Sequence, residues 1–248
     1  MTDVEGYLRY LDVVNDQLLK ARSEAVTQTI AASAVLIARK ILDGGVLYAF
    51  GASHAGLLIQ DQFYRAGGLA PIQPILPPQL MLNTVPVTLT SELEQTPGFA
   101  ETVMRDIRIG SGDLLLIASV SGRNPVAVEM CLIAQKRGST VIALTSVRYS
   151  SAVAGRHGPR LFEVADIVID LPGEVGDAAI ELAAGIPRVG PTSSPVGTAI
   201  LHGLMVQVSL LIMDSGDKPP VFASANLDDS AAWNDRLIRS YQGRLSYL

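Results

Sequence analysis

An unbroken apolar run in the middle of the chain restricts the fold more than any other feature. Residues 114–118 read Leu-Leu-Leu-Ile-Ala, with no alternation of polar and apolar positions. A strand that is apolar on both sides is typical of the centre of a parallel sheet whose two faces are covered by helices. Four more short apolar runs, at 46–50, 72–76, 141–144 and 167–169, alternate with segments of helical periodicity. This alternation predicts an α/β fold with right-handed crossovers.

The second run predicts the order of the strands. It contains Pro74, which cannot donate a hydrogen bond to a neighbouring strand and therefore favours a sheet edge. The common five-stranded order 2-1-3-4-5 places this run at an edge. We therefore predict a three-layer, doubly wound, five-stranded parallel sheet. Its switch point lies between the first and third strands, and a ligand is expected at their carboxyl ends.

The segments outside the sheet suggest three regions. Apolar residues recur at helical spacing from Val4 to Ile41, and Gly44 and Gly45 provide a stop; a break near Arg22 leaves either one or two helices open. We predict an N-terminal helical extension over 1–45, a ligand-binding domain over 46–216 that ends in an apolar helix, and a C-terminal tail over 217–248. The tail is expected to pack on the core or on a partner subunit.

Composition and the chain start exclude several classes of partner. With 19 Lys and Arg against 24 Asp and Glu, the net charge of -5 leaves no surplus to neutralise a nucleic-acid backbone. Residues 1–6 have neither a basic region nor an apolar signal core, and the purely apolar stretches are shorter than a membrane span. We expect a cytoplasmic protein with no nucleic-acid or membrane partner.

The single cysteine, Cys131, is expected to be a buried apolar residue rather than a nucleophile.

Three turns rich in Ser, Thr and Gly predict an anion site. They span 51–56 after the first strand, 119–125 after the third, and 192–198 before the last helix. Each opens a helix, so backbone N–H groups, a positive dipole end and hydroxyls converge, which favours a phosphate or carboxylate. Asn124 is the expected N-cap of the helix that starts at Pro125, and Ser194 is the expected cap of the last helix. A phosphorylated small molecule is the predicted ligand.

Familiar cofactor motifs do not occur. The chain has no G-x-x-x-x-G-K-[ST] run, no lysine in the three turns, and no G-x-G-x-x-G after the first strand, so neither a nucleotide hydrolase nor a dinucleotide enzyme is expected. The three histidines show no zinc-ligand spacing. No cofactor and no metal are predicted.

The three turns resemble the phosphosugar site of sugar isomerase (SIS) domains, and the resemblance covers roughly residues 5 to 245. Segments 121–125, 138–145, 165–167 and 197–199 are similar to N-acetylmuramic acid 6-phosphate etherases. Segments 63–68 and 176–178 resemble more closely a little-annotated SIS branch that includes N-acetylglucosamine 6-phosphate dehydratases. The resemblance implies an SIS-type fold and a phosphorylated aminosugar as ligand.

The resemblance also implies chemistry at C2 of an open-chain aldose phosphate. A carboxylate removes the C2 proton, and the enolate then expels the C3 substituent, as in a lyase or dehydratase, or is protonated at C1, as in an isomerase. Dehydration of N-acetylglucosamine 6-phosphate is the leading expectation. An aldose–ketose isomerase and a non-catalytic sugar-phosphate sensor stay as alternatives, although the forty or so residues before the first strand are too few and too acidic for the DNA-binding domain of transcriptional sensors.

Four catalytic candidates follow from the resemblance. Where the etherases carry a glutamate after the first strand, this chain has only Asp61. Glu92 and Glu94, expected in a loop after the second strand, are the leading base and acid, unless they are solvated loop carboxylates. His202 lies in the last helix, which in SIS proteins often reaches a site at a subunit boundary; an interface histidine is the alternative.

Substrate-binding candidates come from the turns and their neighbours. They are Ser53, His54, Arg65, Ser119, Ser121, Arg123, Asn124, Ser193, Ser194 and Asp177.

The last helix has more apolar surface than one sheet face needs. We therefore expect a homodimer or homotetramer with sites near the subunit boundaries.

Overall fold

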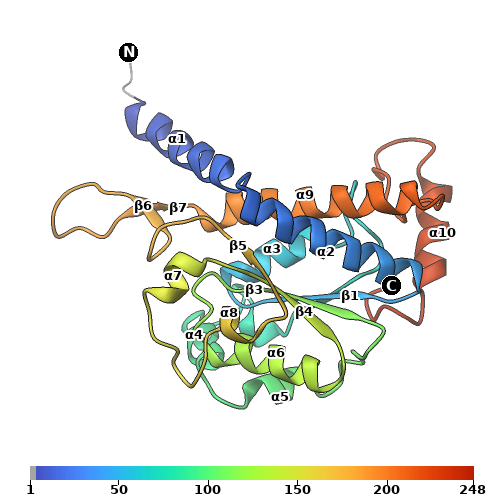
Figure 1. Cartoon of the computed structure of the whole chain (residues 1–248), viewed down its shortest axis with the longest axis horizontal. Helices are drawn as coiled ribbons and strands as arrows, with labels where there is room; N and C mark the ends of the chain where they lie inside the picture. The colour runs from blue at the N-terminus through green and yellow to red at the C-terminus, as the bar shows by residue number, and fades with distance from the viewer. Residues whose placement is uncertain (1–3) are drawn as a thin grey trace.

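The computed structural model describes residues 4–248 and contains the predicted parallel sheet. Its five strands lie in the order β2-β1-β3-β4-β5 (Figure 1), which confirms the doubly wound α/β prediction. The strands are β1 (Leu47–Gly51), β2 (Ile72–Ile75), β3 (Leu114–Ala118), β4 (Thr140–Thr145) and β5 (Ile167–Asp170). Every residue of β3 is buried, as the unbroken apolar run predicts. Pro74 lies on the edge strand, opposite Ala49 of β1.

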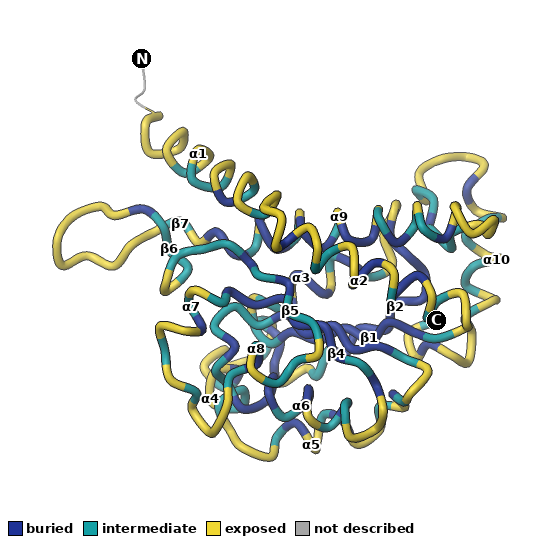
Figure 2. Tube along the Cα trace, in the orientation of Figure 1, coloured by how far each residue is buried: buried dark blue, intermediate teal, exposed yellow. Residues whose placement is uncertain are grey.

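Helices cover both faces of the sheet. One layer contains α2 (Glu24–Leu42), α3 (His54–Gln62) and α9 (Ser193–Asp214). The other contains α4 (Thr88–Glu94), α5 (Phe99–Met104), α6 (Pro125–Lys136) and the short α8 (Leu161–Val164) (Figure 1). Figure 2 shows the buried sheet between these layers.

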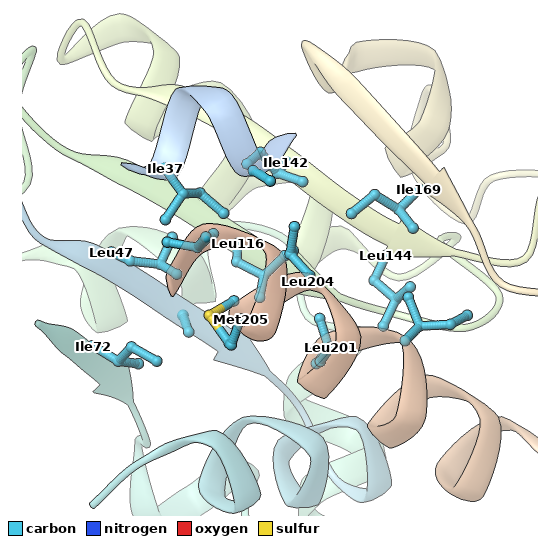
Figure 3. Close-up of a cluster of buried hydrophobic side chains, with 14 of the residues drawn as sticks. Ile37, Leu47, Ile72, Leu116, Ile142, Leu144, Ile169, Leu201, Leu204 and Met205 are labelled. Atoms are coloured by element: carbon cyan, nitrogen blue, oxygen red, sulfur yellow. The ribbon is translucent and has the colours of Figure 1, made fainter. Parts of the chain in front are cut away.

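Two apolar cores result, one on each side of the sheet. Figure 3 shows the first, in which Ile37 of α2 and Leu204 of α9 pack over Leu116 and Ile142 of the sheet. Each such fully buried side chain stabilises the fold by about 1.5–3 kcal/mol. The second core contains Cys131, which is 0% exposed.

The first forty residues form two helices, which settles the alternative left open by the sequence. α1 (Glu5–Lys20) ends before α2 begins, and Gly44, at φ +86°, follows α2. α2 packs against α9 and β5 and is part of the main core. α1 extends away from the body of the molecule (Figure 1).

The C-terminal segment packs along the edge strand. The Gly67 N–H donates to Phe222 O at 2.8 Å, and the Phe222 N–H donates to Gly68 O at 3.0 Å. Gln73 of β2 bonds to Ser246 through both its side-chain amide groups. α10 (Ala231–Tyr241) lies in this segment. The tail thus covers the open edge that a parallel sheet would otherwise present to solvent.

Several local predictions are wrong. Glu92 and Glu94 lie on α4 instead of in a loop, because this short segment packs through Thr90 and Leu93 against the rest of the fold. Helical periodicity in the sequence continues to about residue 66 after the first strand and over 99–109, but α3 ends at Gln62 and α5 ends at Met104. Tyr64 takes φ +46°.

The sequence pattern predicts two irregular stretches, one before and one after β5, and both contain short elements. α7 (Val147–Ser151) follows β4, and η1 (Pro78–Leu80) follows β2 outside these stretches. The hairpin of β6 (Ala178–Ile180) and β7 (Val189–Pro191) follows β5. Elements of three to five residues are too short to show a hydrophobic period, so the sequence pattern does not reveal them.

Two helices, α2 and α9, are long and apolar enough to cross a membrane by length and composition alone. In this fold they pack against each other and against the sheet. Their buried apolar residues therefore belong to the core, while Val35 of α2 and Val206 of α9 are exposed.

Candidate functional site

A cavity of about 230 Å³ opens at the carboxyl ends of β1 and β3. This is the switch point of the sheet, where the crossovers from two neighbouring strands diverge. The β1 turn contributes Ser53 and His54 to its lining, and the β3 turn contributes Ser119, Ser121 and Asn124. The other polar side chains that line it are Glu94, Tyr149 and Asp177.

The turn after β1 is tight and strained. A Cβ on Gly51 would lie 2.4 Å from the carbonyl oxygen of Ala55, so only glycine fits there. Ser53 has φ +54°, which is unusual for a residue with a side chain, and its N–H donates to Leu80 O at 2.7 Å. Strain of this kind persists where the surrounding structure enforces it, often at functional sites. The result is that Ser53 and the start of α3 line the cavity.

The turn after β3 provides a second wall. Gly122 has φ +57°, and a Cβ there would lie 2.9 Å from Thr145 Oγ1. Asn124 is the N-cap residue of α6, as predicted, but its side chain makes no capping bond. Its Oδ1 instead accepts a hydrogen bond from Nε of Arg156 at 2.8 Å.

Glu94 is one of the two carboxylates that line the cavity, and Asp177 is the other. Burial raises the pKa of Glu94 above the ordinary value of 4.5, while a hydrogen bond from Asn124 and the charge of Arg156 lower it in part. A carboxyl group that holds its proton to higher pH is suited to general acid–base work. Glu92, two positions earlier on α4, is exposed and does not line the cavity.

Asp177 joins the cavity to the third turn. It takes φ +70°, and its Oδ1 accepts hydrogen bonds from the N–H groups of Thr192 (3.1 Å) and Ser193 (2.8 Å). Its Oδ2 accepts from Ser193 Oγ at 2.8 Å. The cap of α9 is therefore Asp177 from a separate loop, and the prediction that Ser194 caps this helix is wrong. Ser193 and Ser194 lie within α9 and do not line the cavity.

Three further candidates meet on the α3–α9 surface outside the cavity. Asp61 forms an ion pair with Arg65 at 2.5 Å, and its other oxygen lies 2.7 Å from His202 Nε2. His202 Nε2 also lies 3.1 Å from Arg65. Because Asp61 follows His54 by seven residues, the cluster lies about 10 Å farther along α3.

Arg123 also stays out of the cavity lining, and its Nε is buried without a hydrogen-bond partner among residues 4–248.

Tyr149 is the lining residue that sequence reasoning missed. It lies on α7, inside a stretch expected to be irregular. Ser146 Oγ accepts a hydrogen bond from the Tyr149 N–H at 3.4 Å. Serine is a common N-cap residue, and Ser146, directly before α7, is the sequence signal that could have located this helix.

Metal binding and thiol chemistry have no support in the described part of the chain. Within residues 4–248, no three His, Cys, Asp or Glu side chains are grouped so that they could hold a metal ion. Burial, with the nearby charge of Asp166, raises the pKa of the Cys131 thiol to about 12. The reactive thiolate is thus disfavoured.

Comparisons with known proteins identify similar sequences over the whole chain. A model of the SIS domain matches residues 9–146. The chain is 42% identical over 250 residues to a UPF0309 protein of Shouchella clausii, covering 100% of both chains. It is 41% identical over 246 residues to a UPF0309 protein of Oceanobacillus iheyensis, covering 98% of each.

Two solved structures share the fold. A phosphoheptose isomerase from Francisella tularensis matches with a TM-score of 0.56 and 16% identity, over 85% of this chain and 100% of that one. A phosphoheptose isomerase from Neisseria gonorrhoeae matches with a TM-score of 0.56 and 18% identity, over 82% of this chain and 97% of that one.

Proposed function

This chain belongs to the SIS domain family, and on that premise we propose that it is an enzyme that acts on a phosphosugar in the cavity between β1 and β3. The observation that carries the proposal is Glu94. A partly buried carboxyl group with a raised pKa lies in the same cavity as the hydroxyl-rich turns of β1 and β3. An anion site next to an acid–base group is what enolate chemistry on a sugar phosphate requires.

We assign the phosphate to the hydroxyl side of the cavity. Ser53, Ser119 and Ser121 supply hydroxyls, and the first turns of α3 and α6 supply backbone N–H groups and positive dipole ends. No Lys or Arg is among the cavity-lining residues of the described chain. Affinity for the phosphate therefore rests on N–H groups and hydroxyls.

Glu94 is the proposed base. With its proton released, it takes the proton from C2 of the open-chain sugar, which the neighbouring C1 carbonyl acidifies. The electron pair forms an enolate, and its return expels the C3 hydroxyl, which takes up a proton and leaves as water. We propose N-acetylglucosamine 6-phosphate as the substrate, so that the product carries a C2–C3 double bond.

Asp61 and His202 are proposed as a second proton-transfer pair that acts across a subunit boundary. They lie outside the cavity of their own chain, on the α3–α9 surface. Apolar side chains are exposed on the same two helices, with Leu57 at 45%, Val206 at 60% and Leu210 at 46%. A homodimer that covers this surface would desolvate the pair beside a partner's site.

Isomerisation is the second candidate. The two solved structures with TM-scores of 0.56 are phosphoheptose isomerases by title, and the same Glu94 would form the same enolate. The substrate then carries a hydroxyl at C2, and the difference is the last step: C1 takes up a proton, the C2 hydroxyl loses its proton and becomes the ketone, and the C3 hydroxyl stays. We also propose that the protein works in the cytoplasm, where its single thiol stays reduced.

The deciding experiment follows N-acetylglucosamine 6-phosphate by NMR in deuterated water. Loss of the C2 proton with a new vinylic signal at C3 supports dehydration. A parallel sample contains an aldose 6-phosphate with a hydroxyl at C2, because an acetamido group cannot become a ketone; deuterium at C1 of its ketose product supports isomerisation. Saturable binding without any exchange would contradict both enzyme functions and support a sugar-phosphate sensor.

A further inference from the structure

A second cavity, of about 310 Å³, lies at the carboxyl end of β5. It is bounded by the end of α1, the start of α2, α7 and the loop 171–174. Its volume is at the lower end of the range of roughly 300–1,000 Å³ typical of small-molecule sites. It shares no lining residue with the cavity that contains Glu94.

A buried amide oxygen lines this cavity without a partner. Gln17 is only 3% exposed, and its Oε1 has no hydrogen bond among the described residues. A buried acceptor left unpaired destabilises a fold, and native structures rarely keep one without a use. Gln17 Oε1 therefore calls for a hydrogen-bond donor from a ligand.

The formal charges at the cavity balance, but one cation, Lys20, is left for an anionic ligand. Two cations, Lys20 and Arg148, and two carboxylates, Asp170 and Glu174, line it. Asp170 Oδ1 accepts from the Val147 N–H at 2.8 Å, and Glu174 is paired with Arg148 at 2.8 Å. Lys20 has no ion-pair partner within the described residues. The guanidinium of Arg148 uses one nitrogen for Glu174 and has further N–H groups to offer.

The second cavity is connected to the first through two short segments. On α7, Arg148 lines the second cavity and Tyr149 lines the first. In the following loop, Glu174 lines the second cavity and Asp177 lines the first. The Asp177 N–H donates to Glu174 O at 2.9 Å. A ligand that binds Arg148 or Glu174 thus contacts the same two segments that line the first cavity.

We propose that the second cavity binds a small, hydroxyl-bearing organic anion and that this ligand changes the affinity of the first cavity for its phosphosugar. The anionic group pairs with Lys20 and Arg148, and a hydroxyl donates to Gln17 Oε1. The binding site is independent of the proposed enzyme activity. The coupling rests on the proposed function in one respect: a phosphosugar is the ligand whose affinity for the first cavity is measured.

Citrate is the probe, because it carries both carboxylates and a hydroxyl. Calorimetric titration uses Ser121→Glu, whose added negative charge repels anions from the first cavity. We expect one citrate site in this variant and a loss of affinity of tenfold or more when Lys20→Ala is added. Lys136→Ala removes the same charge from an exposed position on α6 and is expected to leave citrate affinity unchanged. No citrate site in Ser121→Glu, or equal losses with both lysine variants, would overturn the proposal.

Gln17→Leu tests whether the side-chain oxygen of Gln17 binds the ligand or only affects the stability of the fold. Without ligand it is expected to raise the thermal midpoint, because the unpaired buried oxygen is gone. Citrate should then no longer raise the midpoint further. Wild-type citrate affinity in Gln17→Leu would rule out a role of Gln17 in the site; if this variant does not fold, the Lys20→Ala comparison carries the test.

Coupling is measured as the affinity of the wild-type protein for N-acetylglucosamine 6-phosphate with and without saturating citrate. We expect a change of threefold or more, which Lys20→Ala abolishes. An unchanged affinity would show that the two cavities are independent. If the phosphosugar does not bind at all, the proposed function fails while the citrate titration of Ser121→Glu still decides the site.

Discussion

The side-chain amide of Asn124 and the carboxylate of Glu94 line the first cavity together, and Asn124 lowers the pKa of Glu94. The same amide accepts a hydrogen bond from Nε of Arg156 at 2.8 Å, which orients its NH₂ group toward Glu94. Glu94 comes from α4, Asn124 from the turn before α6, and Arg156 from the loop after α7. The acid–base group is thus held by three segments distant in sequence.

Glu94→Gln is expected to remove exchange of the C2 proton. The amide cannot take up the proton, and loss of a general base typically lowers the rate about a hundredfold or more. NMR in deuterated water measures the rate. Glu92→Gln on the same helix is the matched control and should exchange at the wild-type rate, since Glu92 is exposed outside the cavity. Exchange at the wild-type rate in Glu94→Gln would remove Glu94 from the mechanism.

The stability of the protein should also depend on Glu94. Its folded-state pKa lies above 4.5, so the native state holds a proton that the unfolded chain has released. The stabilising contribution of the neutral form is present below pH 4.5 and is lost as the pH rises through the folded pKa, by about 1.4 kcal/mol per pKa unit of the shift. Glu94→Gln should therefore be more stable than wild type at pH 7 and similar to it at pH 4. Urea unfolding at the two pH values checks this, and an advantage confined to pH 4 would contradict it.

Removal of the Asn124 contact should move the pH–rate profile. Burial already raises the pKa of Glu94, and Asn124 partly opposes that rise. Asn124→Ala should therefore raise this pKa further, and the acid limb of the profile should shift to higher pH, because the base must be ionised. Arg156→Gln should shift the limb in the same direction through the lost charge. A shift to lower pH would show that another group limits the rate.

Asp177 is expected to stabilise the start of α9. Asp177→Ala removes three hydrogen bonds to residues 192 and 193 and places alanine at φ +70°, which together should cost about 2 kcal/mol or more. Asp177→Asn keeps an oxygen acceptor and tolerates this backbone region, so its loss should be clearly smaller. Chemical denaturation gives both values. Equal losses would mean that the cap bonds contribute little.

Cys131 should be inert in the native protein. It is 0% exposed, and its pKa is raised to about 12, so iodoacetamide at pH 8 finds almost no thiolate. Alkylation followed by mass spectrometry should show no label in buffer and one label per chain in denaturant. Rapid native labelling would show that the second core opens easily.

Much of this architecture follows from local pattern. The run at 114–118 is apolar at every position, so it had to lie between two helical layers, and Pro74 excluded its strand from the sheet interior. The turns after β1 and β3 then meet at the switch point because neighbouring parallel strands end on the same side. This is why Ser53, Ser119 and Ser121 could be assigned to one site from the sequence.

The choice among the carboxylates could not be made in this way. Glu92 and Glu94 are the same residue type two positions apart, so the sequence pattern does not distinguish them. Only the packing of α4 turns Glu94 into the cavity and leaves Glu92 exposed. The capping of α9 was missed for a similar reason, since Asp177 lies 16 residues before Ser193. A side chain that acts across such a separation leaves no periodic signal.

The sequence by itself therefore determined the sheet, the strand order and the place of the candidate site, because these depend on hydrophobic pattern and turn chemistry within short windows. Only the tertiary structure decided which carboxylate faces the cavity, which residue caps α9, and that Asp61 and His202 meet on an outer surface. These outcomes depend on the angle at which packed elements meet, which no single segment encodes.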